Sequence, residues 1–158
     1  MTAPLAEFLK IAASEADFVE QFVRLLEQEK TLLTEGRTEA LAAVVEKKEQ
    51  LAAKLNALTQ QRGRHLAEHG FTPDRNGMTS WSDRHPEQKE AIAAWNRTLS
   101  LAARAQELNR LNGQLIQLHM QHTGQALEIL LRKDNGLDLY GPDGRSTALG
   151  NQQINDTI

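Results

Sequence analysis

The chain has 158 residues, of which 40% are hydrophobic and 25% are charged, and it contains no cysteine. These values are typical of a soluble globular protein, and the lack of cysteine excludes disulfides, thiolate metal sites and thiol nucleophiles. The net charge is −3, and segment 134–158, with four Asp and one Arg, accounts for all of it, so no nucleic-acid partner is expected.

The first predicted element is a helix over residues 3–34. Two adjacent apolar stripes with heptad spacing make a wide apolar face, so we expect this helix to lie centrally and to touch two neighbours. The first stripe contains Leu5, Leu9, Ala12, Ala16, Val19, Val23, Leu26 and Leu33, and the second contains Phe8, Ile11, Phe18, Phe22, Leu25 and Leu32.

A second helix is predicted over residues 38–69, after a short connection at Gly36. Thr38 is expected to cap its first amides and Gly70 to end it. A connection this short predicts an antiparallel hairpin. Its helical repeat runs through Leu41, Val44, Val45, Lys48, Leu51, Leu55, Leu58, Arg62 and Leu66.

Residues 70–85 contain a proline and an Asn-Gly pair and show no helical periodicity. They predict a loop, held over the end of the bundle by Phe71, Met78 and Trp81. A third helix follows over residues 86–133, with Pro86 at its first position. The tail, residues 134–158, is polar and rich in turn residues.

These elements predict an all-α fold, an antiparallel three-helix bundle or coiled-coil hairpin with a longer third helix and a turn-rich C-terminal tail. The longest uninterrupted apolar run covers only residues 40–45, so we expect neither a signal peptide nor membrane insertion. A cytoplasmic location fits a chain without cysteine.

The length of the third helix is the most informative physical feature. Only about its first thirty residues can pack against the hairpin of the first two helices. This leaves the segment from about 117 to 133 uncovered. An uncovered apolar helix face is typical of a partner surface. The alternative is that the tail or a second copy of the chain covers it. Its apolar residues are Leu118, Met120, Leu127, Ile129, Leu130 and Leu131.

The sequence His65-Leu-Ala-Glu68-His69 has the order of one class of zinc peptidases, in which two imidazoles hold the metal and the Glu activates water. It lacks an obvious third ligand, and histidines are also favoured at a helix end for electrostatic reasons, so a zinc hydrolase is only a remote alternative. No other catalytic motif is present.

Asn112-Gly113 is unusual inside a helix, because glycine there costs about 1 kcal/mol relative to alanine. Close approach of a partner or a slight hinge would offset this cost, and a tolerated surface glycine is an equally good explanation. His119 and His122 lie on the same helix and are expected to be polar positions of a binding surface. In the tail, Leu137, Leu139 and Tyr140 form a short apolar cluster, which predicts a docking motif or, alternatively, a helix-capping contact.

A set of short fragments follows in order along residues 5–146. They are Glu29-Lys30-x-Leu-Leu, then Leu41, Lys48, Leu51, Leu55, Leu58, Arg62 and Gly70, then Asn109-x-x-Asn112-Gly113-x-Leu-Ile, and finally Leu139-Tyr140-Gly141-x-x-Gly144. This ordered set resembles the FlgN family of flagellar export chaperones.

The resemblance implies a cytoplasmic chaperone, with no enzyme activity and no cofactor. Its partners would be the hook-associated proteins at the junction of hook and filament, which it would keep from assembling early, and the flagellar type III export gate. A self-associating helical scaffold or adaptor, homodimeric without a client, is the alternative.

The resemblance also implies two sets of site residues. Client binding in the C-terminal helical part corresponds to Asn112, Gly113, Leu115, Leu118, His122, Leu127, Leu130 and Leu131. Docking to the export gate corresponds to Leu139, Tyr140 and Gly141.

Overall fold

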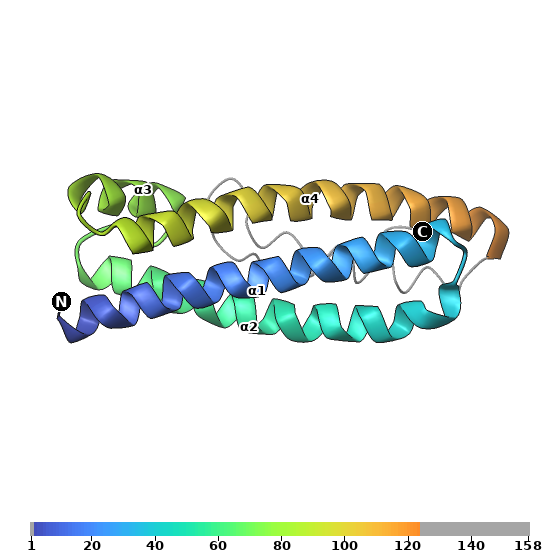
Figure 1. Cartoon of the computed structure of the whole chain (residues 1–158), viewed down its shortest axis with the longest axis horizontal. Coiled ribbons are helices and arrows are strands. Elements are labelled where there is room, and N and C mark those ends of the chain that lie inside the picture. Colours follow the sequence, from blue (N-terminus) through green and yellow to red (C-terminus); the bar gives the residue numbers. More distant parts are fainter. Residues whose placement is uncertain (1, 124–158) are drawn as a thin grey trace.

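The computed structural model describes residues 2–123, and all of its regular structure there is helical. The elements are α1 (Ala3–Thr34), the 3₁₀ turn η1 (Thr38–Ala40), α2 (Leu41–Glu68), α3 (Arg75–Arg84) and α4 (Lys89–Thr123). Helix α1 lies between α2 and α4 and packs against both (Figure 1). This arrangement confirms the all-α bundle and the central position of the first helix.

The three long helices run up, down and up. Helix α2 returns antiparallel to α1, whereas α4 begins at the same end of the bundle as α1 and runs parallel to it (Figure 1). Contacts between side chains follow this direction, since Arg97 of α4 bonds Asp17 of α1 and His119 further along α4 reaches the carbonyl of Leu33. Helix α4 therefore finds its main partner in α1 rather than in α2, which precedes it in the chain.

Glycines end both helices of the hairpin, as the sequence predicted. Gly36 has φ 72° and Gly70 has φ 87°, a conformation that side chains with a Cβ disfavour. After α1, the amides of Gly36 and Arg37 donate to the carbonyls of Leu33 and Leu32 at 3.2 and 2.9 Å, which is the Schellman pattern. The free carbonyls at the end of the helix are thereby satisfied.

Thr38 does not cap the second helix. It begins the short turn η1, whose N-terminal cap is the backbone of Arg37 without a side-chain hydrogen bond, and α2 follows from Leu41. The prediction of a helix from residue 38 was therefore early by one 3₁₀ turn.

The prediction of a loop over residues 70–85 was wrong, because α3 lies within it. Asp74 starts the helix by accepting from the amide of Gly77 at 2.9 Å, and Thr72 donates to the same carboxylate oxygen at 2.6 Å. The Asn-Gly pair is thus part of a first helical turn rather than a break. Met78 and Trp81, three residues apart, share its buried face and cover the end of the bundle.

Gly77 is required there for a steric reason. A Cβ at this position would lie 1.7 Å from the carbonyl oxygen of Thr72, closer than any real contact. The glycine thus permits the chain entering α3 to cross over the first turn of the helix.

The third long helix begins later than predicted. Pro86 belongs to a turn in which the amide of Gln88 donates to the carbonyl of His85 at 2.9 Å, and α4 starts at Lys89. The structure describes α4 as far as Thr123, so the predicted helix end at residue 133 lies outside the described residues, as does the tail.

Apolar side chains fill the bundle in three groups along its length. The middle group joins all three long helices, one end group joins the end of α1 to α2 and α4, and the other end group places α3 over α1, α2 and α4. Their central members are Val19, Leu26, Leu55 and Leu108; Leu33, Leu41 and Ile116; and Phe8, Met78, Trp81 and Trp95.

A polar layer lies on one side of the middle group. Arg62 of α2 forms a fully buried ion pair with Glu15 of α1, and Thr59 donates to the same carboxylate at 3.1 Å. The guanidinium of Arg62 also lies 4.5 Å from the ring centre of Trp95 in α4, a cation–π distance. Three helices thus share one buried charge.

A second polar layer lies two heptads further along α1. Lys48 of α2 donates to both carboxylate oxygens of Glu29 at 3.1 and 3.2 Å. Asn112 of α4 donates to Glu29 at 2.8 Å and to the carbonyl of Leu26 at 2.9 Å. Buried charges are tolerated only when they are paired in this way, and here the pairing also fixes the register of the helices.

Candidate functional site

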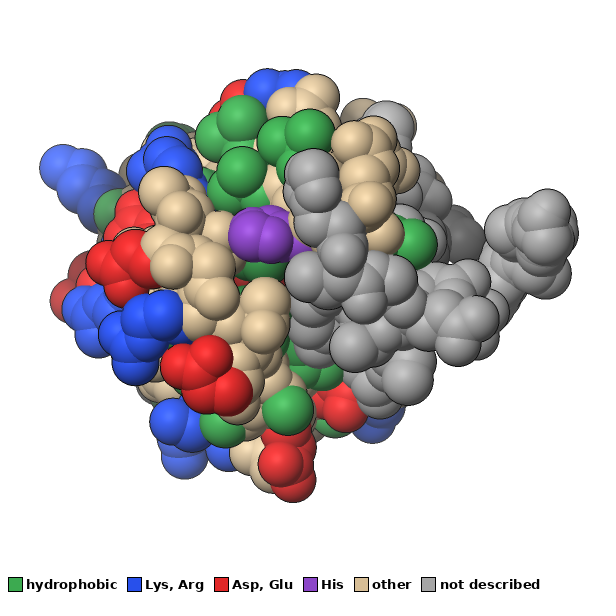
Figure 2. Space-filling view, turned by 90° about the vertical axis from the view of Figure 1, so that its right-hand side faces the viewer, with side chains coloured by type: hydrophobic (Ala, Val, Ile, Leu, Met, Phe, Trp, Pro, Cys, Tyr) green, Lys and Arg blue, Asp and Glu red, His purple; other side chains and the backbone are tan. Residues whose placement is uncertain are grey.

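The predicted client surface lies on the last turns of α4. Leu118 is 55% exposed and is the single large hydrophobic side chain of residues 2–123 that is open to solvent. Leu115, three residues earlier, is half-buried and packs against the core group at this end of the bundle. Figure 2, which looks onto this end, shows a group of hydrophobic side chains above a histidine.

The comparison of helix lengths predicted that the uncovered segment of α4 begins at about residue 117. The structure shows that it does not. Ile116 is fully buried, Met120 packs against the same core group, and the ring of His119 bonds the carbonyl of Leu33 at 2.7 Å. The reason is that α1 continues to Thr34 and α4 runs parallel to it, so both helices extend together to this end. Only the outward face of α4, with Leu118, stays open before residue 121.

Asn112 does not lie on the predicted surface. Its side chain is fully buried, and both of its donated hydrogen bonds go to α1. The side-chain amide of Asn112 therefore positions α4 against α1. The prediction that Asn112 contacts a client directly was wrong.

Gly113, next to Asn112, has open space around it. A Cβ built at this position meets no described atom within 4 Å. Packing within residues 2–123 therefore does not require glycine here, which leaves a tolerated surface glycine or the approach of a partner as its explanation.

The remaining predicted site residues are placed only in part. His122 lies in the last described turn of α4. Outside the described residues are Leu127, Leu130, Leu131, Leu139, Tyr140 and Gly141.

The two histidines of the zinc alternative stack on one another. The rings of His65 and His69 have centres 4.3 Å apart, and His65 also stacks on Phe8 at 4.1 Å. Within residues 2–123, no group of three or more His, Asp or Glu side chains is arranged to hold a metal ion. Stacked faces do not direct their ring nitrogens at a common point, so the geometry gives the zinc alternative no support.

Burial lowers the pKa of His65. The neighbouring His69 lowers it further, and Glu68 acts in the opposite direction. The cause is the cost of placing a charged imidazole against apolar rings and next to a second imidazole.

The sequence reasoning missed the partners of the buried charges, Glu15 and Glu29. The sequence does contain a sign of these ion pairs. Both glutamates fall at gaps in the second apolar stripe of the first helix, and the opposite charges, Lys48 and Arg62, lie on the facing stripe of the second helix. His119 was expected to be a surface polar residue, whereas it caps the end of α1 from α4.

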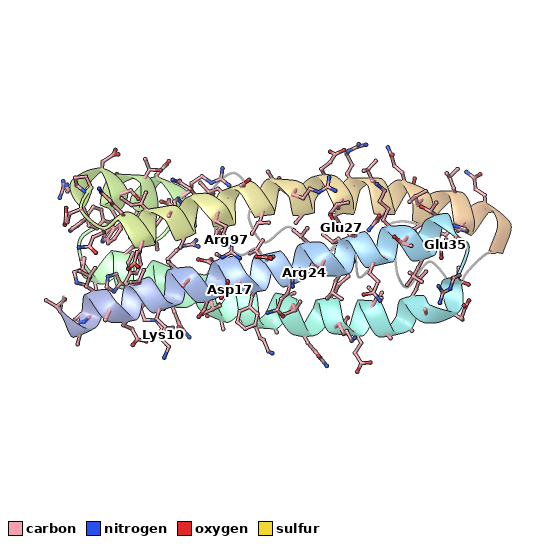
Figure 3. The ribbon with its side chains drawn as sticks, in the orientation of Figure 1. Lys10, Asp17, Arg24, Glu27, Glu35 and Arg97 are labelled. Atoms are coloured by element: carbon pink, nitrogen blue, oxygen red, sulfur yellow. The ribbon has the colours of Figure 1, made fainter. Side chains whose placement is uncertain are left out.

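Exposed ion pairs border the contact between α1 and α4. Arg97 bonds Asp17 at 3.1 Å and also pairs with Glu20, and Arg104 bonds Glu27 at 3.2 Å; Figure 3 shows Arg97 beside Asp17 along this border. The bonds to Glu20 and Asp17 raise the pKa of Arg97. Such exposed pairs contribute little stability, but they favour the parallel alignment of the two helices.

None of the helices between residues 2 and 123 combines the length and the apolar character that crossing a membrane would need.

Comparisons with known proteins agree with this architecture. Two curated flagella synthesis proteins named FlgN, from Yersinia enterocolitica and from its serotype O:8, biotype 1B strain, are each 32% identical over 135 residues, covering 84% of both chains. A crystal structure of a flagella synthesis protein FlgN from Pseudomonas aeruginosa has the same fold, with a TM-score of 0.64 and 24% identity over 82% of this chain and 98% of that one.

The family model for the FlgN protein matches residues 1–148. With this match over nearly the whole length, the chain belongs to the FlgN family.

Proposed function

We propose that this protein is a cytoplasmic export chaperone of the bacterial flagellum. It binds hook-associated proteins, prevents their early assembly and delivers them to the type III export gate. Membership of the FlgN family supports a role in flagellum synthesis, for which the relatives are named. The observation that carries the client-binding part is the exposed Leu118 on the outward face of α4.

A client helix can extend the apolar stripe of α4. Leu111 and Leu115 are half-buried and Leu118 is exposed, so apolar side chains spaced by four and three residues open progressively towards the end of the helix. An amphipathic helix of the client would bury this stripe and hide its own apolar face. The proposed surface continues through His122, Leu127, Leu130 and Leu131. Gly113 lies on another side of α4, since residues two apart in a helix do not share a face, so close approach there would involve a separate part of the client.

The test is light scattering with a hook-associated protein, intact and without its terminal helices. Fully burying an exposed leucine contributes about 1.5–3 kcal/mol, and Leu118 is 55% exposed, so Leu118→Ala should weaken the complex several-fold. Ala103→Ser, a change at another exposed position of α4, is the control. A complex that survives replacement of Leu118, Leu127 and Leu130 together by alanine would contradict the proposed surface.

The gate-docking residues Leu139, Tyr140 and Gly141 are proposed as a second, separate contact. Tyr140→Ala should therefore keep the client and lose delivery to the gate. If that variant instead lost the client, the two surfaces would have been separated wrongly. A tight homodimer that ignores every client would favour the scaffold alternative.

A further inference from the structure

A pocket of about 750 Å³ lies at the end of the bundle away from Leu118, between the start of α1 and the ends of α2 and α3. Its apolar lining includes Leu5, Phe71 and Trp81, and its polar lining includes His65, His69, Arg84 and His85. This volume is in the range of sites that bind small molecules or peptide side chains. Nothing in the proposed client or gate contacts uses it.

Two of the imidazoles are oriented by the backbone. Nδ1 of His69 bonds the carbonyl of His65 at 2.9 Å, and Nδ1 of His85 bonds the carbonyl of Trp81 at 2.9 Å. A carbonyl oxygen only accepts, so Nδ1 carries the proton in each ring. Neither Nε2 has a hydrogen-bond partner among the described residues, and each becomes a donor when its ring is protonated.

Stacking holds the same rings in place. His85 lies flat on Trp81, with ring centres 4.7 Å apart, and His69 lies on His65 at 4.3 Å. Each ring is held by stacking on its face and by a hydrogen bond at Nδ1, so it loses little conformational entropy when a ligand binds. The site is therefore preorganised.

The permanent charges around the pocket nearly balance. Arg84 makes no ion pair among the described residues and lies 5.4 Å from the ring centre of Phe71. Glu87 lines the same pocket from the turn before α4, Glu68 acts on His65 from α2, and the first turn of α1 contributes no acidic residue. The imidazoles therefore decide the sign of the potential, which turns positive when they are protonated.

We propose that this pocket binds an acidic peptide segment of a partner protein, a carboxylate side chain beside a bulky apolar one, with uptake of protons by its imidazoles. The carboxylate accepts from Arg84 and from the protonated rings of His69 and His85, and the apolar side chain packs against Phe71 and Leu5. Burial, and next to it the neighbouring His69, lower the pKa of His65 in the free pocket, so a bound anion and a proton on this ring stabilise each other's binding.

The chain's own acidic tail is a poorer occupant. Lys89 adjoins the pocket and Thr123 lies 34 residues further along α4, about 51 Å away at 1.5 Å per residue. Tyr140, 17 residues beyond Thr123, reaches back only if that whole segment is extended, at about 3.3–3.6 Å per residue. A separate chain meets no such constraint.

The test uses the full chain and the peptide N-acetyl-Asp-Leu-Tyr-Asp amide, with the corresponding Asn-Leu-Tyr-Asn peptide as the uncharged control. Calorimetry at about pH 8 and about pH 5.5, on either side of the ordinary histidine pKa, should show affinity for the acidic peptide rising about tenfold or more on acidification. Titration in two buffers of different ionisation enthalpy should show proton uptake at intermediate pH.

Arg84→Gln should weaken binding at both pH values, and His69→Gln with His85→Gln should reduce the pH dependence to what His65 alone contributes. Arg110→Gln, an exposed arginine on the second half of α4, is the matched control and should change nothing. Thermal unfolding checks that each variant folds. Equal affinity for both peptides, or tighter binding at high pH, would overturn the proposal, and tighter binding in Tyr140→Ala would make the tail the occupant instead.

Discussion

Two buried ion pairs occupy positions that apolar side chains fill elsewhere between α1 and α2. Glu15 pairs with Arg62, and Glu29, two heptads later in α1, pairs with Lys48, two heptads earlier in α2. A slip of one helix along the other by less than two heptads would bury these charges without partners. The pairs therefore define a single register at some cost in stability relative to an apolar core.

Lys48→Met should destabilise the protein strongly. It leaves the carboxylate of Glu29 buried with only Asn112 as donor, at a cost of about 3–5 kcal/mol in the free energy of unfolding. Adding Glu29→Leu should recover most of the loss, because no unpaired charge then remains buried in this layer. Urea unfolding followed by circular dichroism measures both, with exposed Lys47→Met as the control. A double variant no more stable than the single one would contradict this account.

His65 should make the protein less stable in acid. Its pKa is lowered in the folded state, first by burial and then by His69, so the unfolded chain binds a proton more readily. Stability from this group is complete above the ordinary histidine pKa and declines as the pH falls below it. His65→Phe keeps the stacking on Phe8, and the midpoint of its thermal unfolding should fall less on acidification than in the parent chain. An unchanged pH dependence would assign the effect to other groups.

Two helical glycines differ in whether the surrounding structure leaves room for a side chain. Gly77, in the first turn of α3, lies under the carbonyl of Thr72, whereas Gly113 in α4 has no described atom near its missing Cβ. Helix α3 therefore depends on a close backbone approach, and α4 bears a glycine that its own packing does not need.

Gly77→Ala should destabilise the chain because the chain segment around Thr72 must move. Gly113→Ala should stabilise it by about 0.5–1 kcal/mol through helix propensity alone. Chemical unfolding measures both, and each variant is the other's control. A destabilising Gly113→Ala would show that α4 needs a bend at this position. If Gly113→Ala is stable but binds the client poorly, the glycine serves close approach of the partner.

At the scale of the molecule, α1 is the common partner of both other long helices. A local unfolding event that releases α2 leaves the contact between α1 and α4 in place, and one that releases α4 leaves the contact between α1 and α2 in place. Exposing the middle of α1 to solvent requires that both contacts separate. Hydrogen exchange should therefore be slowest for amides of residues 19–26 in α1. Mass spectrometry on peptides from the full chain measures this, and equal protection in the middle of α4 would contradict it.

Much of this architecture could be predicted because the helix faces that pack together carry apolar residues at regular spacing in the sequence. The bounds of α1, the glycine stops and its central position all follow from the two apolar stripes and the residues that end them. Helix α3 could not be predicted, since its cap and Gly77 depend on a backbone crossing between Thr72 and the first helical turn, which no local pattern reveals. The burial of Asn112 likewise depends on Glu29, far away in the chain.

The central place of α1 has a consequence for how the protein is made. The ribosome releases α1 first and α4 last, so the growing chain holds an α1–α2 hairpin before the helix that covers the other side of α1 exists. During that interval the uncovered side is the surface most prone to aggregation. The acidic residues Asp17, Glu20 and Glu27 border this side and later pair with arginines of α4. Glu20 already bonds Arg24 within α1, so before α4 emerges it is mainly the charge of Asp17 and Glu27 that keeps nascent chains apart.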